Sequence, residues 1–300
     1  MQVPGPFEYE RATGVDDAIA LLDRLGEEAR LVAGGHSLLP MMKLRLANPE
    51  FLIDINDLEG ELGYITMEPA LVRIGAMTRH RRLLESDDLA AVFPIFRDAE
   101  WVIADPIVRN RGTIGGSLCQ ADPAEDLGTV CRVLGATCVV RGPGGVREIP
   151  IEEVSVGPYE TSLAHNEILT EITIPRRDHS ASAYAKVERR AGDWAVTAAG
   201  AAVTVEGGEF VRAAVGLTAV DSDPAGLSAV SDYLVGRPPS EEAFIQAGRL
   251  AAQACSPVGD VRGTVDYKRH LASELTTRTL RTAVDRVLRA DVEHQPTGGA

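Results

Sequence analysis

Two glycine pairs constrain this chain more than any other feature. The first lies in Ala33-Gly34-Gly35-His36-Ser37 and the second in Thr113-Ile114-Gly115-Gly116-Ser117. Glycine adopts positive φ at low cost and lets another group approach the chain closely, because it has no Cβ. Successive amide N–H groups in such a segment converge on an anion. We therefore expect the amides of both segments to hold a diphosphate from two sides, with hydroxyls added by Ser37, Thr113 and Ser117. An ordinary tight turn is the alternative for either segment alone.

The first pair lies between a predicted strand and a predicted helix. Residues 28–32 end in a short apolar run, and a helix is expected over 38–46, before Pro49. A helix N-terminus at this point favours phosphate binding. The chain has no Gly-x-Gly-x-x-Gly leading into a helix and no Gly-x-x-x-x-Gly-Lys-Ser/Thr. Neither a Rossmann unit nor a P-loop is therefore supported.

The residues around both pairs resemble motifs of a known flavoprotein family. Residues 33–46 are similar to the first flavin-binding motif of the FAD-carrying medium subunit of molybdenum hydroxylases, and residues 113–126 to the second. Residues 184–190, followed by Gly192-Asp193-Trp194, form a third, supporting match. The similarity runs in order from about residue 3 to residue 285. This family includes the medium chain of carbon monoxide dehydrogenase and the flavin domain of xanthine dehydrogenase.

Strands and helices alternate without a steady βαβ repeat, which disfavours a doubly wound sheet and favours an α+β fold. The resemblance implies a two-lobed FAD-binding domain of the vanillyl-alcohol-oxidase type over residues 1–177. A smaller α+β domain with a β-sheet and helices is expected over 178–290, and a disordered tail over 291–300. The polar stretch 175–180 supports the boundary.

Several finer elements are predicted from local patterns. Thr13 is expected to cap a helix that runs through Glu28, and a helix over 89–104 is expected to break at Pro94. Runs 195–205 and 210–220 predict a hairpin around Gly207-Gly208. Three helices are expected to follow. The last spans about 265–288, with an apolar stripe formed by Leu271, Leu275, Leu280, Val284 and Leu288.

The resemblance also implies a set of cofactor contacts. Asp126 is expected to accept a hydrogen bond from a sugar or ribityl hydroxyl, and capping its own helix is the alternative. Lys186 is expected near the pyrimidine end of the flavin, or else as a solvated lysine. Trp194 is expected to cover one flavin face, or to be an ordinary core or interface residue. The complete predicted set is Ala33, Gly34, Gly35, His36, Ser37, Ile103, Thr113, Ile114, Gly115, Gly116, Ser117, Asp126, Leu169, Lys186 and Trp194.

Composition limits the other partners. The net charge of −14 makes nucleic acid an improbable partner. No apolar run approaches the roughly 20 residues of a membrane span, and no signal peptide is recognised, so a cytoplasmic protein is expected. Peripheral association with the inner face of the membrane through a complex is left open. The four cysteines and six histidines show no metal-ligand spacing, so no metal site is expected.

The sequence shows no nucleophile with a base and no other set of catalytic residues for an organic substrate. By resemblance, the chain binds FAD non-covalently, takes electrons from the two [2Fe–2S] clusters of a small subunit and passes them to an external acceptor. Molybdopterin lies on a large subunit, and a dimer of heterotrimers is expected. A stand-alone flavin reductase of the UDP-N-acetylenolpyruvylglucosamine reductase type and a flavin-free assembly protein remain alternatives. The substrate of the complex and the final acceptor are left open.

Overall fold

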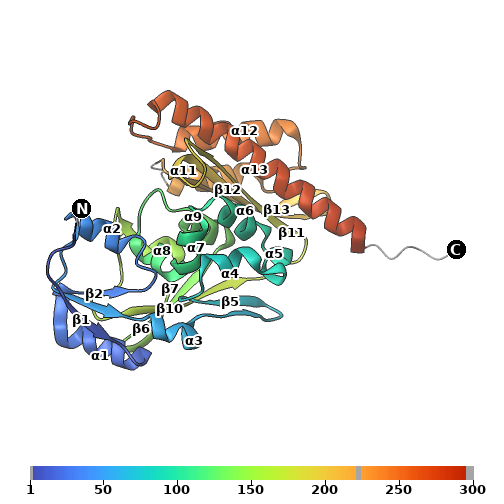
Figure 1. Cartoon of the computed structure of the whole chain (residues 1–300). Helices are drawn as coiled ribbons and strands as arrows, with labels where there is room; N and C mark the ends of the chain where they lie inside the picture. Colours follow the sequence, from blue (N-terminus) through green and yellow to red (C-terminus); the bar gives the residue numbers. More distant parts are fainter. Residues whose placement is uncertain (1–2, 221–223, 295–300) are drawn as a thin grey trace. The chain divides into compact units, whose positions relative to one another are not determined.

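A computed structural model describes residues 3–220 and 224–294, which divide into two compact units (Figure 1). Unit 1 comprises residues 1–85, 104–122 and 135–175. Unit 2 comprises residues 86–103, 123–134 and 176–300. Each unit is therefore built from separate stretches of chain. No local pattern predicted that residues 86–103 and 123–134 would belong with the C-terminal half.

Unit 1 begins with a small parallel sheet in the order β1-β3-β2. Its strands are β1 (Glu8–Arg11), β2 (Ala29–Val32) and β3 (Phe51–Asp54), with α1 (Val15–Leu25), the 3-10 turn η1 (Gly26–Glu28) and α2 (Leu38–Lys43) between them. Apolar residues of α1, including Ala18 and Leu22, share a core with Ile53 of β3. The amphipathic pattern of α1 therefore covers this sheet.

The predicted start of α1 needs correction. Gly14, not Thr13, is the N-cap residue, and its backbone is extended. The amide and hydroxyl of Thr13 both donate to Asp17 Oδ2, at 2.8 and 2.9 Å. The helix ends at Leu25, since Gly26 has a φ of +69° and starts the 3-10 turn instead.

The rest of unit 1 is organised by a five-stranded antiparallel sheet in the order β4-β5-β10-β6-β7. The central strand β10 (Ile168–Pro175) pairs with β5 on one side and β6 on the other. The remaining elements are η2 (Asn56–Leu58), α3 (Glu59–Leu62), β4 (Ile65–Met67), β5 (Leu71–Gly75), α4 (His80–Glu85), α7 (Pro106–Arg111), α8 (Ile114–Gln120), β6 (Thr137–Gly142), β7 (Gly145–Pro150), α10 (Ile151–Val154), β8 (Ser155–Gly157) and β9 (Glu160–Thr161).

Unit 2 is built on an antiparallel sheet in the order β11-β12-β13. Its strands are β11 (Ser180–Glu188), β12 (Ala195–Glu206) and β13 (Glu209–Thr218), so the predicted hairpin is confirmed. All residues of β12 except Glu206 are buried. A strand is buried in this way when both faces of its sheet are covered, which accounts for its run of alanine and valine.

Within unit 2, helices pack on both faces of the sheet β11-β12-β13. One face packs on α11 (Pro224–Leu234), α12 (Glu241–Ala254) and α13 (Val265–His294), which share a core with the sheet (Figure 1). On the other face, Gly200 and Gly216 lie against Ile95 of α6 (Pro94–Val102) and Thr129 of α9 (Asp126–Leu134). The helix α5 (Asp87–Val92) ends just before Pro94, which confirms the predicted break.

The long C-terminal helix extends beyond its expected end. Leu271, Leu275, Leu280 and Val284 are buried as predicted, whereas Leu288 is 50% exposed. Residues 291–294 continue α13, which corrects the expectation of disorder for this stretch. Residues 295–300 lie outside the described part of the chain. The predicted α+β class is confirmed.

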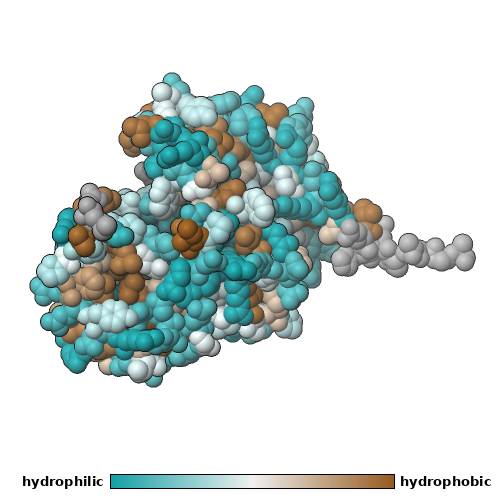
Figure 2. Space-filling view, viewed as in Figure 1, coloured by the Kyte–Doolittle hydropathy of each residue, from teal (hydrophilic) through white to brown (hydrophobic). Residues whose placement is uncertain are grey.

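The face shown in Figure 2 is mainly hydrophilic, with separate apolar patches. Among the most exposed large apolar side chains are Leu46 and Ile107 of unit 1 and Trp101 and Val261 of unit 2. None of the helices in residues 3–220 and 224–294 combines the length and the hydropathy of a membrane span.

Replacing glycine by alanine is expected to have opposite effects on stability at two helical positions, Gly248 and Gly128. A Cβ on Gly248 of α12 would lie 2.5 Å from the Ser273 carbonyl oxygen of α13, and a backbone atom has little freedom to move away. Gly248→Ala is expected to lower the free energy of unfolding by about 1–3 kcal/mol through overpacking. A Cβ on Gly128 of α9 meets nothing within 4 Å. Gly128→Ala is therefore expected to stabilise by about 0.5–1 kcal/mol. Urea denaturation checks both values, and equal effects would contradict the packing argument.

Candidate functional site

The first glycine segment forms the loop between β2 and α2. Gly35 has a φ of +75°, and a Cβ there would lie 2.9 Å from Leu39 Cδ1. Gly34 serves a different purpose, because its Cβ would lie only 2.4 Å from the Arg111 carbonyl oxygen. One glycine therefore permits the turn, and the other permits close contact with the stretch of chain before the second segment.

This loop carries uncommitted hydrogen-bond donors. Among the hydrogen bonds of residues 3–220 and 224–294, none uses the amide N–H of Gly34, Gly35, His36 or Ser37 as its donor. The Ser37 side chain makes no capping bond to α2. The loop is half-buried, apart from the exposed His36. Adjacent free amides without bulky side chains suit an anion such as a diphosphate, as predicted from the sequence.

The second glycine segment folds differently from the expected cradle. Thr113 is the N-cap residue of α8, and its hydroxyl accepts from Gly116 N at 3.1 Å. The amides of Ile114, Gly115 and Ser117 donate to the carbonyls of Thr78, Ala76 and Thr113, at 3.1, 2.9 and 3.0 Å. The amides of 114–117 thus have protein partners, which corrects the prediction of a second amide cradle. The proposed cofactor contacts of these residues remain predictions.

Glycine in this second segment allows close packing instead. A Cβ on Gly115 would lie 2.7 Å from both the Cβ and the carbonyl oxygen of Ala76. Gly115 and Ser117 are buried, whereas Gly116 is exposed. The segment is therefore fixed against residues 76–79 by its first helical turn. Leu169, another predicted contact, is buried in β10, next to the Thr170 carbonyl that accepts from Ala76 N at 2.9 Å.

A polar network that the sequence analysis missed joins the two segments. Asn56 Nδ2 donates to the Ala33 carbonyl at 2.8 Å, and Asn56 Oδ1 accepts from Arg79 and Arg111, both at 3.0 Å. Arg79 also donates to the Arg111 carbonyl and pairs with Glu59 at 2.8 Å. The Arg79 side chain is only 9% exposed. No local motif marks Asn56 or Arg79, because both are defined by partners that lie far along the chain.

In unit 2, Asp126 and Lys186 form a buried ion pair. Lys186 Nζ lies 2.9 Å from Asp126 Oδ2, with side-chain exposures of 2% and 6%. The same ammonium donates to the Val102 carbonyl at 3.1 Å, and Tyr184 Oη donates to Asp126 Oδ1 at 2.6 Å. The structure thus brings together two predicted contacts, and neither side chain is solvated. Their proposed roles toward a flavin stay predictions.

Burial and the neighbouring polar groups have opposite effects on the pKa of Asp126. Burial raises the pKa of Asp126, because the charged carboxylate is removed from water. The Lys186 ammonium and the Tyr184 hydroxyl oppose this by stabilising the ionised form. Burial and the nearby Asp126 charge hold the pKa of Tyr184 well above its usual value. Tyr184 is therefore a hydrogen-bonding hydroxyl at ordinary pH.

The remaining predicted contacts of unit 2 lie at element ends. Trp194 precedes β12 and is 41% exposed. Its turn is held by Glu188, whose Oε1 accepts from Gly192 N at 3.1 Å. Ile103 is the half-buried C-cap residue of α6.

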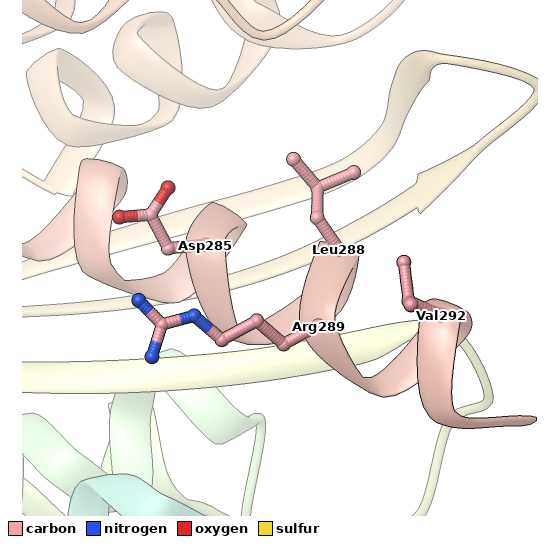
Figure 3. A pocket seen from close by; sticks show the side chains of 4 residues that line it. All are labelled: Asp285, Leu288, Arg289 and Val292. Atoms are coloured by element: carbon pink, nitrogen blue, oxygen red, sulfur yellow. The ribbon is translucent and has the colours of Figure 1, made fainter.

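A surface hollow on α13 does not belong to this set. Asp285, Leu288, Arg289 and Val292 line it from successive turns of one helix (Figure 3). None of these residues was predicted as a cofactor contact, and the lining contains no cluster of polar groups suited to chemistry.

Comparison with known proteins assigns both parts of the chain. Residues 5–177 match the family model described as the FAD binding domain in molybdopterin dehydrogenase. Residues 182–283 match the CO dehydrogenase flavoprotein C-terminal domain. A carbon monoxide dehydrogenase medium chain from Afipia carboxidovorans is 41% identical, over 95% of this chain and 97% of that protein. A glyceraldehyde dehydrogenase medium chain from Sulfolobus acidocaldarius is 32% identical, over 93% and 98%.

Solved structures agree with these sequence relatives. The carbon monoxide dehydrogenase of Hydrogenophaga pseudoflava contains a chain that is 40% identical and superposes with a TM-score of 0.89, covering 95% of this chain and 99% of that one. Quinoline 2-oxidoreductase from Pseudomonas putida 86 contains one that is 31% identical with a TM-score of 0.88, covering 96% and 100%. Of the alternatives that the sequence left open, these similarities support the first. The chain belongs to the family of FAD-binding subunits of molybdenum hydroxylases.

Proposed function

We propose that the loop of residues 33–37 binds the diphosphate of FAD and that this chain is the electron outlet of a carbon monoxide dehydrogenase-like complex. The observation that carries the proposal is the set of free amides at Gly34–Ser37, on a loop whose two glycines leave no room for side chains. Asn56 and Arg79 hold this loop against the second segment, so its donors are fixed before a ligand arrives. Fixed donors bind an anion without a large loss of conformational entropy.

Bound FAD supplies reversible electron transfer, and the chain supplies binding and orientation. The free amides and the Ser37 hydroxyl would donate to diphosphate oxygens. The hydroxyls of Thr113 and Ser117 and the exposed backbone of Gly116, at the start of α8, would contribute contacts beside them. In unit 2, Lys186, Asp126, Trp194 and Ile103 are proposed to line the cofactor, as is Leu169 in unit 1.

We infer that the partners are a large molybdopterin subunit and a small [2Fe–2S] subunit, assembled as a dimer of heterotrimers. Several relatives are named as the medium chain or medium subunit of an enzyme, which supports a complex. Exposed apolar side chains near the glycine segments, such as Leu46 and Ile107, each 70% exposed, would suit such contacts. The proposed location is cytoplasmic, with membrane association only through the complex.

Carbon monoxide is the proposed substrate of the complex, because relatives at 41% and 39% identity are carbon monoxide dehydrogenase medium chains. Relatives with 32% and 34% sequence identity are named for other substrates. We also infer a domain boundary near residue 177, since one family model ends there and the next begins at 182.

Acid precipitation of the purified complex is expected to release FAD into the supernatant, because the proposed contacts are all non-covalent. Absorbance of the supernatant and chromatographic identification of the released flavin check this. Colour retained in the pellet would indicate a covalent link. A colourless complex that cannot be reconstituted with FAD would contradict the assignment.

Substitutions in the first loop should raise the Kd for FAD at least about tenfold, which corresponds to roughly 1.4 kcal/mol of binding, and lower the FAD content of the purified protein. Gly34→Ala would displace the Arg111 carbonyl, and Gly35→Val would strain a positive-φ position. Gly60→Ala is the matched control, since a Cβ there meets nothing within 4 Å. Flavin-to-protein ratios are compared for variants of equal thermal stability. Normal FAD content in both loop variants would show that these glycines form an ordinary turn.

Electrons should reach this subunit only within the complex, because no set of acid–base residues for substrate oxidation accompanies the loop. Anaerobic carbon monoxide should leave the flavin absorbance of the FAD-loaded isolated chain unchanged and bleach that of the complex. Dithionite, which reduces flavins directly, is the positive control for both. Rapid bleaching of the isolated chain by carbon monoxide would contradict the subunit assignment.

A further inference from the structure

A chain of buried hydroxyl groups extends inward from Asp126 in unit 2. Tyr184 Oη lies 2.6 Å from Asp126 Oδ1 and 3.1 Å from Thr218 Oγ1. Thr218 Oγ1 lies 2.6 Å from Thr129 Oγ1, which lies 3.1 Å from the Leu217 carbonyl oxygen. The four side chains come from α9, β11 and β13, and each is at most 7% exposed. Four contacts therefore connect a carboxyl group to a main-chain carbonyl.

Counting hydrogens shows that this chain is incomplete when Asp126 is ionised. Tyr184, Thr218 and Thr129 each carry a single hydroxyl hydrogen, so three hydrogens must serve four contacts. Tyr184 donates to the Asp126 carboxylate, Thr218 donates to Thr129, and Thr129 donates to the Leu217 carbonyl. The contact between Tyr184 Oη and Thr218 Oγ1 is then left without a hydrogen.

A proton on Asp126 completes the count. The carboxyl hydrogen can then be donated to Tyr184, whose own hydrogen turns toward Thr218. Thr218 and Thr129 keep their donations to Thr129 and the Leu217 carbonyl. Four hydrogens serve four contacts in this arrangement. Hydroxyl hydrogens rotate freely about the C–O bond, so the change needs no movement of heavy atoms.

We propose that Asp126 is a buried proton-binding site and that its protonation turns the Tyr184 hydroxyl from Asp126 toward Thr218. The ligand is a single proton, bound at a carboxylate oxygen. Binding converts the Asp126–Lys186 ion pair into a hydrogen bond between a neutral carboxyl and an ammonium. The local charge of this site thus becomes more positive by one unit.

The charges around Asp126 make both states accessible. Lys186 favours the carboxylate, whereas Glu188, whose Oε2 lies 3.8 Å from Lys186 Nζ, disfavours it. Glu125 acts electrostatically on Tyr184. From the neighbouring helices, Asp98 of α6 accepts from the Tyr184 amide and is paired with Arg286 of α13. These last two charges offset each other. Burial favours the protonated form, in agreement with the raised pKa of Asp126.

The proposal deepens the proposed function, because Lys186 and Asp126 are among the predicted flavin contacts. A site that takes up a proton can compensate negative charge that arrives nearby. It remains distinguishable from the FAD assignment, since the carboxyl can be observed directly in protein from which flavin has been removed. Failure of FAD binding would leave the hydrogen count unchanged.

Infrared difference spectroscopy of the flavin-free complex, titrated from acid to neutral pH, tests the proposal. A C=O stretching band of a protonated carboxyl should persist at pH values above the ordinary pKa of aspartate. The band should be absent in Asp126→Asn. Thr218→Val should lower the pKa of this band by roughly half a unit to one unit, because the protonated chain loses an acceptor. Tyr184→Phe should raise it, because the carboxylate loses its donor.

Thr204→Val is the matched control. It removes a buried hydroxyl of the same sheet that bonds to Ser180 and not to this chain, so it should leave the band unchanged. A second readout is stability: wild type should lose stability relative to Asp126→Asn as pH rises from about 3.8 through the raised pKa, where the folded state gives up its extra proton. Absence of the band, or a band unaffected by Thr218→Val, would overturn the proposal.

Discussion

At Gly34 the main chain of the first glycine segment lies against the carbonyl of Arg111, with no space for a Cβ between them. Arg79 donates to that same carbonyl, and Asn56 bonds to both Arg111 and the Ala33 carbonyl. The polar network and the absence of a Cβ at Gly34 both stabilise the same contact, the one between Gly34 and the Arg111 carbonyl. The arrangement of the free amides in unit 1 follows from it, because the network fixes the loop from behind and leaves its N–H groups unused.

Unit 2 depends on a different constraint, the burial of one ion pair beneath a sheet covered on both faces. Lys186 and Asp126 each satisfy their remaining polar atoms within the unit, which a buried pair requires if it is not to destabilise the fold. Removing either partner would leave an uncompensated charge. The alternative considered for Lys186, a solvated strand lysine, is therefore wrong.

The sequence predicted what short-range patterns encode. Pro94 ends a helix because proline lacks an amide hydrogen, and Gly207-Gly208 forms a hairpin because glycine adopts positive φ. The sequence could not show that the amides of Ile114 and Gly115 are used inside the protein, since their acceptors, the carbonyls of Thr78 and Ala76, lie far along the chain. Asn56 and Arg79 were missed for the same reason. Their importance comes from tertiary neighbours and not from any local motif.

The division of each unit among separate stretches of chain has a consequence for synthesis. The helices α6 and α9 emerge from the ribosome before β11–β13, the sheet whose face they cover. Their apolar sides, including Ile95 and Val133, must wait for partners that lie well over fifty residues later. Contacts between distant residues form slowly and leave apolar surface exposed in the meantime. A nascent chain stopped at residue 177 would therefore contain α6 and α9 in contact with each other, while the faces that cover the sheet stay exposed to water.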